Sequence, residues 1–326
     1  MNKNTKPVIA ILDPLVPATR EKLAALMPTG FDIVYASERS IEHLKALIAH
    51  ADYAVSGQTP VPGELLRAAT RLRLLHKWGV GVDNFDLDTA RELNIPVART
   101  TASNAAPVAE YALGLMIATM RSLAFGHAEL QQGRWRGFPL PRDSLLISGK
   151  TVGIIGFGAI GQRLAQLLSG FGCRLLYNKR TPLPPDEEAS LNAEFADLPT
   201  LLDTADIVSL NCPLTDQTAG MINRDALQRM KSTAILVNVA RGGIVLEDDL
   251  YWALKNRVIH AAATDVFETE PLSANSPLLT LDNLVATPHL AALAADSFAP
   301  TVKRIAANIE RVARGEAIPE FERVVR

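Results

Sequence analysis

The sequence predicts an α/β protein with two doubly wound parallel-sheet domains. Short apolar runs alternate with helix-forming segments through the first hundred residues, and a second alternation starts at residue 151. In that second part, a glycine-rich turn at residues 156–161 stands between an apolar run and a helix-forming segment. Strands that alternate with helices in this way form parallel sheets covered by helices. A length of 326 residues also favours two domains over one.

The first domain is expected to contain five strands, at residues 8–12, 31–35, 53–56, 72–76 and 96–98. Helices are expected between them, at residues 17–27, 41–50, 63–69 and 88–93. Residues 104–131 form one long helical run with few breakers, whose apolar residues recur at helical spacing. A run of this length is typical of a crossing between domains or a subunit contact, and burial in a core is the simpler alternative.

The second domain is expected to contain six strands, at residues 151–155, 174–177, 207–210, 234–238, 258–264 and 284–286. Residues 291–314 have the pattern of an amphipathic helix and carry no strand that would extend the second sheet. We therefore expect this last segment to return to the first domain. The predicted domains are residues 1–101 with 292–326, and residues 102–291.

Composition narrows the class of protein. The formal charge of −2 and the isoelectric point near 6.3 give no overall attraction to nucleic acid or to a membrane surface. Two cysteines, Cys173 and Cys212, are too few for a disulfide framework and fit a reducing cytosol. No apolar run reaches the roughly 18 residues that a membrane span needs. We expect a cytoplasmic protein with no nucleic-acid, membrane or metal site.

The turn after the apolar run at residues 151–155 has the spacing G-x-G-x-x-G, with Gly156, Gly158 and Gly161. Gly156 allows the tight turn out of the strand, and Gly158 lets a pyrophosphate come close to the backbone. Gly161 lets the following helix pack on the strand. The N-terminus of that helix offers free N–H groups and the positive end of its dipole to the phosphates. Strand and helix supply the context that a bare glycine motif lacks, so dinucleotide binding is predicted.

The segment about 20 residues after the first glycine indicates which dinucleotide is bound. An acid at this position normally holds the ribose 2′-hydroxyl group of NAD. The sequence here is Tyr177-Asn178-Lys179-Arg180-Thr181, which contains no acid. Asn178, Lys179 and Arg180 are therefore candidate cofactor residues, and the two cations would attract a 2′-phosphate. NADP(H) is the preferred cofactor, NAD(H) is possible, and a solvated basic loop is the structural alternative.

Three charged residues follow predicted strands farther along the chain, where an open α/β sheet places its site. Arg241 can hold a carboxylate with two hydrogen bonds and polarise a neighbouring carbonyl. His289 has the intrinsic pKa of a proton donor to a developing alkoxide. Glu270 can orient that imidazole and raise its pKa, although Glu268 is two residues away and spacing alone does not choose between them. Each could equally be a structural residue, but the three together point to hydride transfer on a 2-keto acid.

Asp265 precedes this acidic segment, and the sequence allows two roles for it. Its carboxylate can meet the nicotinamide, or it can cap a helix or a turn.

These motifs, in order along nearly the whole chain, resemble those of the D-isomer-specific 2-hydroxyacid dehydrogenases. That family includes phosphoglycerate dehydrogenase and the hydroxypyruvate and glyoxylate reductases. The segments that carry the resemblance are 79–84 (GVGVDN), 108–110 (VAE), 149–153 (GKTVG) before the glycine turn, 212–215 (CPLT), 238–243 (NVARGG), 265–267 (DVF) with 270–271 (EP), and 287–289 (TPH).

The resemblance implies a role for each candidate. Arg241 matches the substrate-binding arginine, His289 the general acid/base, and Glu270 the partner of the histidine, which selects it over Glu268. Asp265 matches the aspartate at the nicotinamide. The remaining matches are to the loop that binds the substrate carboxylate through backbone N–H groups, at Val80 and Gly81, and to cofactor contacts at Ala159, Ile160, Cys212, Val239 and Ala240.

The same resemblance implies a Rossmann cofactor domain inserted in a discontinuous, flavodoxin-like substrate domain, usually in a homodimer. The chain departs from the family pattern in two places. The usual acid is missing at residues 177–181, which look like those of the NADPH-using hydroxypyruvate and glyoxylate reductases. Leu290-Ala291-Ala292 follows the histidine where glycine is frequent. No regulatory domain is expected beyond Arg326.

The sequence therefore predicts an NADPH-preferring reductase of a small 2-keto acid, with glyoxylate and hydroxypyruvate as the best candidates. The first alternative is an NAD-dependent dehydrogenase acting on phosphoglycerate or D-lactate. The second is a non-catalytic protein that senses NAD(H), which the presence of Arg241, Glu270 and His289 disfavours.

Overall fold

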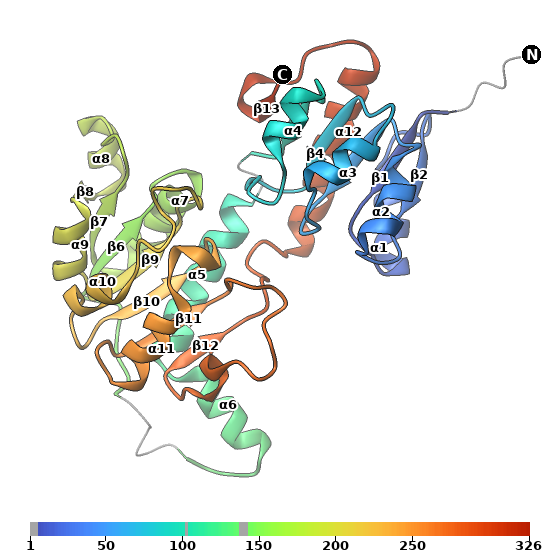
Figure 1. Ribbon diagram of the computed structural model, residues 1–326. Coiled ribbons are helices and arrows are strands. Elements are labelled where there is room, and N and C mark those ends of the chain that lie inside the picture. The colour runs from blue at the N-terminus through green and yellow to red at the C-terminus, as the bar shows by residue number, and fades with distance from the viewer. Residues whose placement is uncertain (1–5, 102–103, 137–142) are drawn as a thin grey trace, which may run out of the picture. The chain divides into compact units, whose positions relative to one another are not determined.

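The computed structural model describes residues 6–101, 104–136 and 143–326, and the chain divides into two compact units. Unit 1 comprises Met1–Asn104 and Ala294–Arg326, and unit 2 comprises Ala105–Leu293 (Figure 1). The division falls after residues 104 and 293, where the sequence analysis expected it after 101 and 291. Unit 1 is thus built from two separate stretches of chain.

Unit 1 contains a six-stranded sheet with the order β13-β5-β4-β3-β1-β2. The first five strands along the chain are parallel and have the flavodoxin-like order 2-1-3-4-5. Only β13 is antiparallel to its neighbour, and the sequence analysis did not predict this three-residue strand. The strands are β1 (Val8–Ile11), β2 (Asp32–Tyr35), β3 (Tyr53–Ser56), β4 (Leu74–Lys77), β5 (Val97–Arg99) and β13 (Arg323–Val325).

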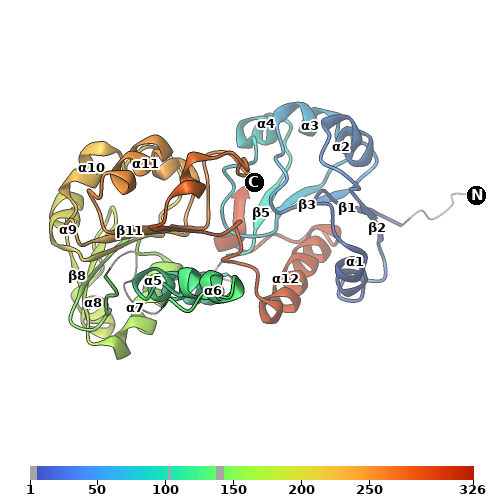
Figure 2. The same cartoon turned by 90° about the horizontal axis from the view of Figure 1, so that it is seen from below.

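Helices cover both faces of this sheet, because successive residues of its central strands point to opposite sides. Ile9 and Ile11 of β1 pack in one core cluster with α1 and α12, while Ala10 and Leu12 pack in another with α2 and α3. Figure 2 shows α1 and α12 on one face and α2, α3 and α4 on the other. The helices are α1 (Pro17–Ala24), α2 (Ile41–Ile48), α3 (Gly63–Ala68), α4 (Leu87–Glu92) and α12 (Ala295–Ala313).

Unit 2 contains a seven-stranded parallel sheet with the order β12-β11-β10-β9-β6-β7-β8. From β8 inward this is the Rossmann order 3-2-1-4-5-6 with one further strand, and the order reverses between β6 and β9. Strand β8 was not predicted, because two of its three residues are exposed. The strands are β6 (Thr151–Ile155), β7 (Arg174–Asn178), β8 (Ala193–Phe195), β9 (Ile207–Leu210), β10 (Ile235–Asn238), β11 (Ala261–Thr264) and β12 (Leu284–Ala286).

Two layers of helices enclose the second sheet. Helices α5 and α7 pack on one face, and α9, α10 and α11 on the other. The helices are α5 (Ala105–Met120), α6 (Leu123–Gln131), α7 (Ala159–Leu168), α8 (Pro185–Leu191), α9 (Leu198–Thr204), α10 (Arg224–Arg229) and α11 (Glu247–Lys255). Short 3₁₀ turns occur at Ser169–Phe171, Gly242–Ile244, Pro277–Thr280 and Glu320–Glu322.

The long helical run expected at residues 104–131 is two helices, so that expectation was wrong. The chain breaks at Ser122, which adopts a left-handed conformation with φ of 52°. Neither Arg121 nor Ser122 is a glycine or proline, and the apolar spacing continues past them, so no local pattern indicates the break. Among the described residues no single helix is long and apolar enough to span a membrane; α5 and α6 meet that test only as a pair bent by 67°.

The predicted fold class is confirmed. Both units are α/β units built on parallel sheets, one with the flavodoxin-like order and one with the Rossmann order. In each unit the carboxyl ends of the parallel strands lie at one edge of the sheet, which is where such folds bind ligands.

Candidate active site

The predicted site residues of unit 2 lie at the carboxyl ends of six of its parallel strands. They are Gly156–Gly161 after β6, Asn178 at the end of β7 with Lys179 and Arg180 beyond it, Cys212 after β9, Val239, Ala240 and Arg241 after β10, Asp265 and Glu270 after β11, and His289 after β12. Residues spread over more than 130 positions of sequence are therefore brought to one edge of one sheet.

The glycine turn has the shape that phosphate binding requires. Gly156 has φ of +90°, and a Cβ atom there would come within 2.4 Å of the backbone nitrogen of Cys212, across the point where the strand order reverses. A Cβ atom on Gly161 would come within 2.4 Å of the carbonyl oxygen of Gly156. A Cβ atom on Gly158, in contrast, would meet no atom within 4 Å. Gly158 therefore leaves open space at the start of α7.

That open space lies against helix N–H groups. Gly158 is the N-cap of α7 and has no side chain to accept from the first turn, whose N–H groups have no acceptor within the helix. The amides of Ala159 and Ile160 are among these groups. A turn with free N–H groups and room for phosphate oxygens fits the pyrophosphate of a dinucleotide. Cys212 borders the same turn, and burial raises the pKa of its thiol to about 11, so the group is neutral near pH 7.

The loop after β7 presents two cations. Asn178 donates from its side chain to the carbonyl oxygen of Ala196 at 2.9 Å, which fixes the start of the loop. Lys179 is half-buried and Arg180 is exposed. Neither side chain has a hydrogen bond or an ion pair with any residue in the described ranges, although Asp186 and Glu187 follow closely in sequence. The charge of this loop is therefore not neutralised by the described part of the chain.

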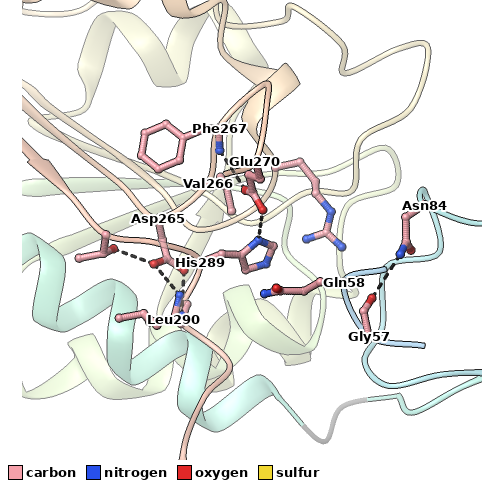
Figure 3. A network of polar contacts seen from close by, with 12 residues as sticks. Gly57, Gln58, Asn84, Asp265, Val266, Phe267, Glu270, His289 and Leu290 are labelled. Carbon is pink, nitrogen blue, oxygen red and sulfur yellow. Dashed lines mark hydrogen bonds and ion pairs between the residues drawn. The ribbon is translucent and has the colours of Figure 1, made fainter. Parts of the chain in front are cut away.

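His289 and Glu270 form a hydrogen-bonded pair. The Nδ1 atom of His289 lies 2.7 Å from Oε2 of Glu270, and Figure 3 shows the imidazole directed at the carboxylate. The side chains are 29% and 34% exposed, so neither is fully buried. His289 has φ of +53°, which is uncommon for a residue other than glycine, and its N–H donates to the carbonyl oxygen of Asp265 at 2.8 Å. Backbone conformations of this kind cluster at functional sites.

The environment keeps Glu270 ionised. Burial by itself raises the pKa of its carboxyl, but the hydrogen bond and charge of His289, the N–H of Phe267 at 3.1 Å and the charge of Arg241 outweigh burial and lower it. Glu268 turns elsewhere, since its carboxylate accepts from the backbone N–H of Glu247 at 2.9 Å. The structure therefore pairs Glu270 with the histidine, a choice that spacing alone left open.

Asp265 is fully buried and caps the turn that carries His289. Its carboxylate accepts from the hydroxyl of Thr287 at 2.6 Å and from the N–H groups of Leu290 and Ala291, both at 2.8 Å (Figure 3). These bonds show that Asp265 caps a turn, which is one of the two roles that the sequence allows. Contact with a nicotinamide stays a prediction.

Two residues that the sequence analysis did not single out shape the turn of Arg241. Asn238 is almost fully buried, accepts from the N–H of Ala240 and donates to the carbonyl oxygen of Arg241, both at 3.0 Å. A Cβ atom on Gly242 would come within 1.9 Å of the backbone of Phe267, so only glycine fits there. This close approach sets the Arg241 turn against the segment that leads to Glu270. The sequence feature that could have indicated this close approach is the double glycine after Arg241.

Unit 1 has its own candidate residues at the carboxyl end of β4. Gly79 bonds to Thr100 through its N–H at 2.9 Å and its carbonyl oxygen at 3.1 Å. Val80 and Gly81, which come next, have N–H groups without a hydrogen-bond acceptor among residues 6–101, 104–136 and 143–326. Two adjacent free N–H groups can bind a carboxylate.

Hydrogen bonds to Asp13 and Asn84 hold the loop after β3. Asp13 accepts from the N–H groups of Gln58 at 3.0 Å and Thr59 at 2.9 Å, and the side-chain amide of Asn84 donates to Gly57 at 3.2 Å (Figure 3). Such buried networks hold a loop in one conformation. In the part of the chain that the structure describes, no group of three metal-ligating side chains occurs.

The fold and this edge define the class of protein. A Rossmann-order sheet with an open glycine turn, and a histidine–carboxylate pair at the same edge, make a dinucleotide-dependent oxidoreductase. Residues 113–291 match the family model described as D-isomer specific 2-hydroxyacid dehydrogenase, NAD binding domain.

Individual relatives agree with this match. The chain is 38% identical to the hydroxypyruvate reductase of Thermotoga maritima over 78% of this chain and 83% of that protein. It is 34% identical to the D-3-phosphoglycerate dehydrogenase of Mycobacterium bovis over 96% of this chain, but it spans 58% of that protein. The NADPH-dependent glyoxylate/hydroxypyruvate reductase of Sinorhizobium meliloti, solved with NADP and malonate, superposes with a TM-score of 0.85 at 28% identity, over 98% of this chain and 97% of that one.

The chain belongs to the D-isomer-specific 2-hydroxyacid dehydrogenase family. It is an NAD(P)-dependent oxidoreductase that interconverts 2-hydroxy and 2-keto acids.

Proposed function

We propose that this enzyme is an NADPH-preferring reductase of a small 2-keto acid, glyoxylate or hydroxypyruvate. The observation that carries the reductase assignment is the bond between His289 and Glu270 at the carboxyl edge of the sheet. A 2-keto acid needs a proton donor for its carbonyl oxygen and a cation for its carboxylate, and both are offered at this edge. The names of the Thermotoga and Sinorhizobium relatives support these two substrates.

Each residue then has a role in the reaction. His289 gives its proton to the carbonyl oxygen as the alcohol forms, and anionic Glu270 holds the imidazole in place through its bond to Nδ1. Arg241 binds the carboxylate and polarises the carbonyl. The N–H groups of Val80 and Gly81 in unit 1 are further candidates for binding a carboxylate. When bound, the nicotinamide cofactor supplies the hydride.

The remaining predicted residues would hold the cofactor. Gly156, Gly158 and Gly161, with the N–H groups at the start of α7, would take the pyrophosphate. Lys179 and Arg180 would pair with the 2′-phosphate, and Asn178 would fix the loop that carries them. The other proposed contacts are Ala159, Ile160, Cys212, Val239, Ala240 and Asp265.

The second candidate is an NAD-dependent dehydrogenase of phosphoglycerate or D-lactate. This candidate is supported by the similarity to the Mycobacterium enzyme over nearly the whole of this chain. The loop at Lys179 and Arg180 disfavours this candidate, because it has no acid at the position where NAD-binding members need one.

Steady-state kinetics separates these candidates. Reduction of glyoxylate and hydroxypyruvate is measured with NADPH and with NADH, in the wild type and in Arg180→Ala. Losing one charge-assisted contact to phosphate should raise the KM for NADPH about tenfold or more and leave the KM for NADH unchanged. Asp186→Ala is the matched control, because it removes a nearby surface charge of opposite sign. The cofactor proposal fails if the wild type uses both cofactors equally well and Arg180→Ala changes neither.

We also propose a cytoplasmic homodimer. Helix α6 and the residues after it expose Leu123, Leu130 and Trp135, the last at 90% of its surface. Exposed apolar side chains that cluster along one helix are typical of an interface. Light scattering during gel filtration should give twice the mass of one chain, and Leu130→Glu should lower it.

A further inference from the structure

Tyr177 joins the two loops that are proposed to hold the cofactor. It lies in β7 one residue before the basic loop, and it is fully buried. Its ring stacks on that of Phe157, with centroids 4.3 Å apart and planes inclined by 22°. Phe157 is the residue between Gly156 and Gly158, so the glycine turn rests on the Tyr177 ring. Phe195 contacts the ring edge-on at 5.7 Å.

The hydroxyl of Tyr177 reaches in the other direction. It accepts a hydrogen bond from the backbone N–H of Leu183 at 2.7 Å and donates to Oε1 of Glu188, in α8, at 2.6 Å. Burial raises the pKa of this hydroxyl, so it keeps its proton and remains a donor at physiological pH. The two bonds tie the far end of the basic loop to the strand from which the loop leaves.

The loop between these anchors has no other backbone support. Residues 179–182 make no backbone hydrogen bond with any residue in the described ranges. Asn178 fixes the near end through Ala196, and Leu183 fixes the far end through Tyr177. Lys179 and Arg180 lie between these two points. Their positions therefore depend on the two anchors more than on bonds of their own.

We propose that Tyr177 is a positioning residue for the 2′-phosphate of NADPH. The Tyr177 hydroxyl holds the basic loop at a set distance from the glycine turn. This inference rests on the proposed preference for NADPH. Two cations bind a phosphate most tightly when both already lie in place, because ordering each unrestrained side chain on binding costs free energy. The ring, in contrast, supports the glycine turn, which serves NADH and NADPH alike.

The variant Tyr177→Phe tests this assignment, because it removes the hydroxyl and keeps the ring. Losing one hydrogen bond that orders the loop should raise the KM for NADPH roughly two- to tenfold. The kcat with NADPH and both constants with NADH should stay at wild-type values. A residue that only stabilises the fold would change the two cofactors equally.

A binding measurement makes the test independent of turnover. Calorimetric titration with 2′,5′-ADP and with 5′-AMP compares ligands that differ by the 2′-phosphate. Tyr177→Phe should weaken 2′,5′-ADP several-fold and leave 5′-AMP unchanged. Phe157→Leu should weaken both ligands by the same factor, because it alters the glycine turn. Tyr35→Phe, which loses a hydroxyl bonded to Arg20 in unit 1, is the matched control and should alter neither.

The outcomes separate the two proposals. A wild type that binds 2′,5′-ADP no more tightly than 5′-AMP overturns the NADPH assignment, and the role of Tyr177 falls with it. A wild-type preference that Tyr177→Phe retains in full overturns the positioning role alone. Equal weakening of both ligands by Tyr177→Phe would also overturn it, and unfolding midpoints of each variant check that the chain is folded in the assay.

Discussion

Two segments at the carboxyl edge of the unit 2 sheet differ in how they are built. The turn at residues 287–291 carries His289, and its polar groups have partners within the chain: three donors bond to the buried carboxylate of Asp265, and the imidazole bonds to Glu270. Among the described residues, the backbone of the basic loop at residues 179–182 finds no hydrogen-bond partner, and neither do its two cations.

The difference follows from what each segment is proposed to do. Proton transfer requires the donor to stand in one orientation before the substrate arrives, so the turn is fixed by bonds within the protein. Phosphate recognition requires charges that the protein has not already neutralised, so the cations are left for the ligand. Under the proposed function, bonds within the chain fix the proton donor, whereas the two cations of the proposed 2′-phosphate subsite are left for the ligand.

The largest expected effect comes from His289→Ala. Removal of the proposed proton donor should lower kcat by roughly 10² or more with glyoxylate or hydroxypyruvate. Because the basic loop is untouched, the ratio of the KM values for NADPH and NADH should stay as in the wild type. Stopped-flow and steady-state rates with both cofactors measure this. A variant that keeps wild-type turnover would remove His289 from the mechanism.

Asp265→Asn should have the next largest effect. The amide would place N–H groups against the donors of Leu290 or Ala291, and an unsatisfied buried donor costs about 1–3 kcal/mol. The free energy of unfolding in urea should fall by that amount, and kcat should fall about tenfold with either cofactor because the His289 turn shifts. Unchanged stability would show that the bonds of Asp265 do not hold the turn.

Glu270→Gln should alter the dependence on pH. The pKa of Glu270 is lowered in the folded protein, so the carboxylate adds stability above the ordinary glutamate pKa of 4.5, and this contribution is lost as the pH falls through the lowered value. The stability difference between wild type and variant should therefore shrink below about pH 4.5.

The rate of keto-acid reduction provides a second measurement on the same variant. Without the carboxylate that bonds to Nδ1, the imidazole loses the group that orients it, so kcat should fall about tenfold with either cofactor. Glu268→Gln is the matched control, because that carboxylate bonds to Glu247 instead of His289. The same loss of kcat in both variants would contradict a specific role for Glu270.

Most elements could be predicted because their cause is local. The strands of both sheets are short apolar runs buried on two faces, such as Tyr53–Ser56 and Ile207–Leu210, and such runs are visible in a single sequence. Strands β8 and β13 escaped prediction, since three residues at a sheet edge need no apolar pattern. The break at Ser122 escaped as well, because nothing in the residues beside it disfavours a helix.

The sequence by itself determined the alternation of strands and helices, the glycine turn and the residue types available for chemistry, because these depend on spacing along the chain. Only the tertiary structure decided that Asp265 holds the histidine turn and that Gly242 sets the Arg241 turn against Phe267. It also shows directly the bond between Glu270 and His289, which spacing left open and the family resemblance implied. These contacts join the ends of different strands. They depend on strand order and on the packing of one turn against another, which no local pattern encodes.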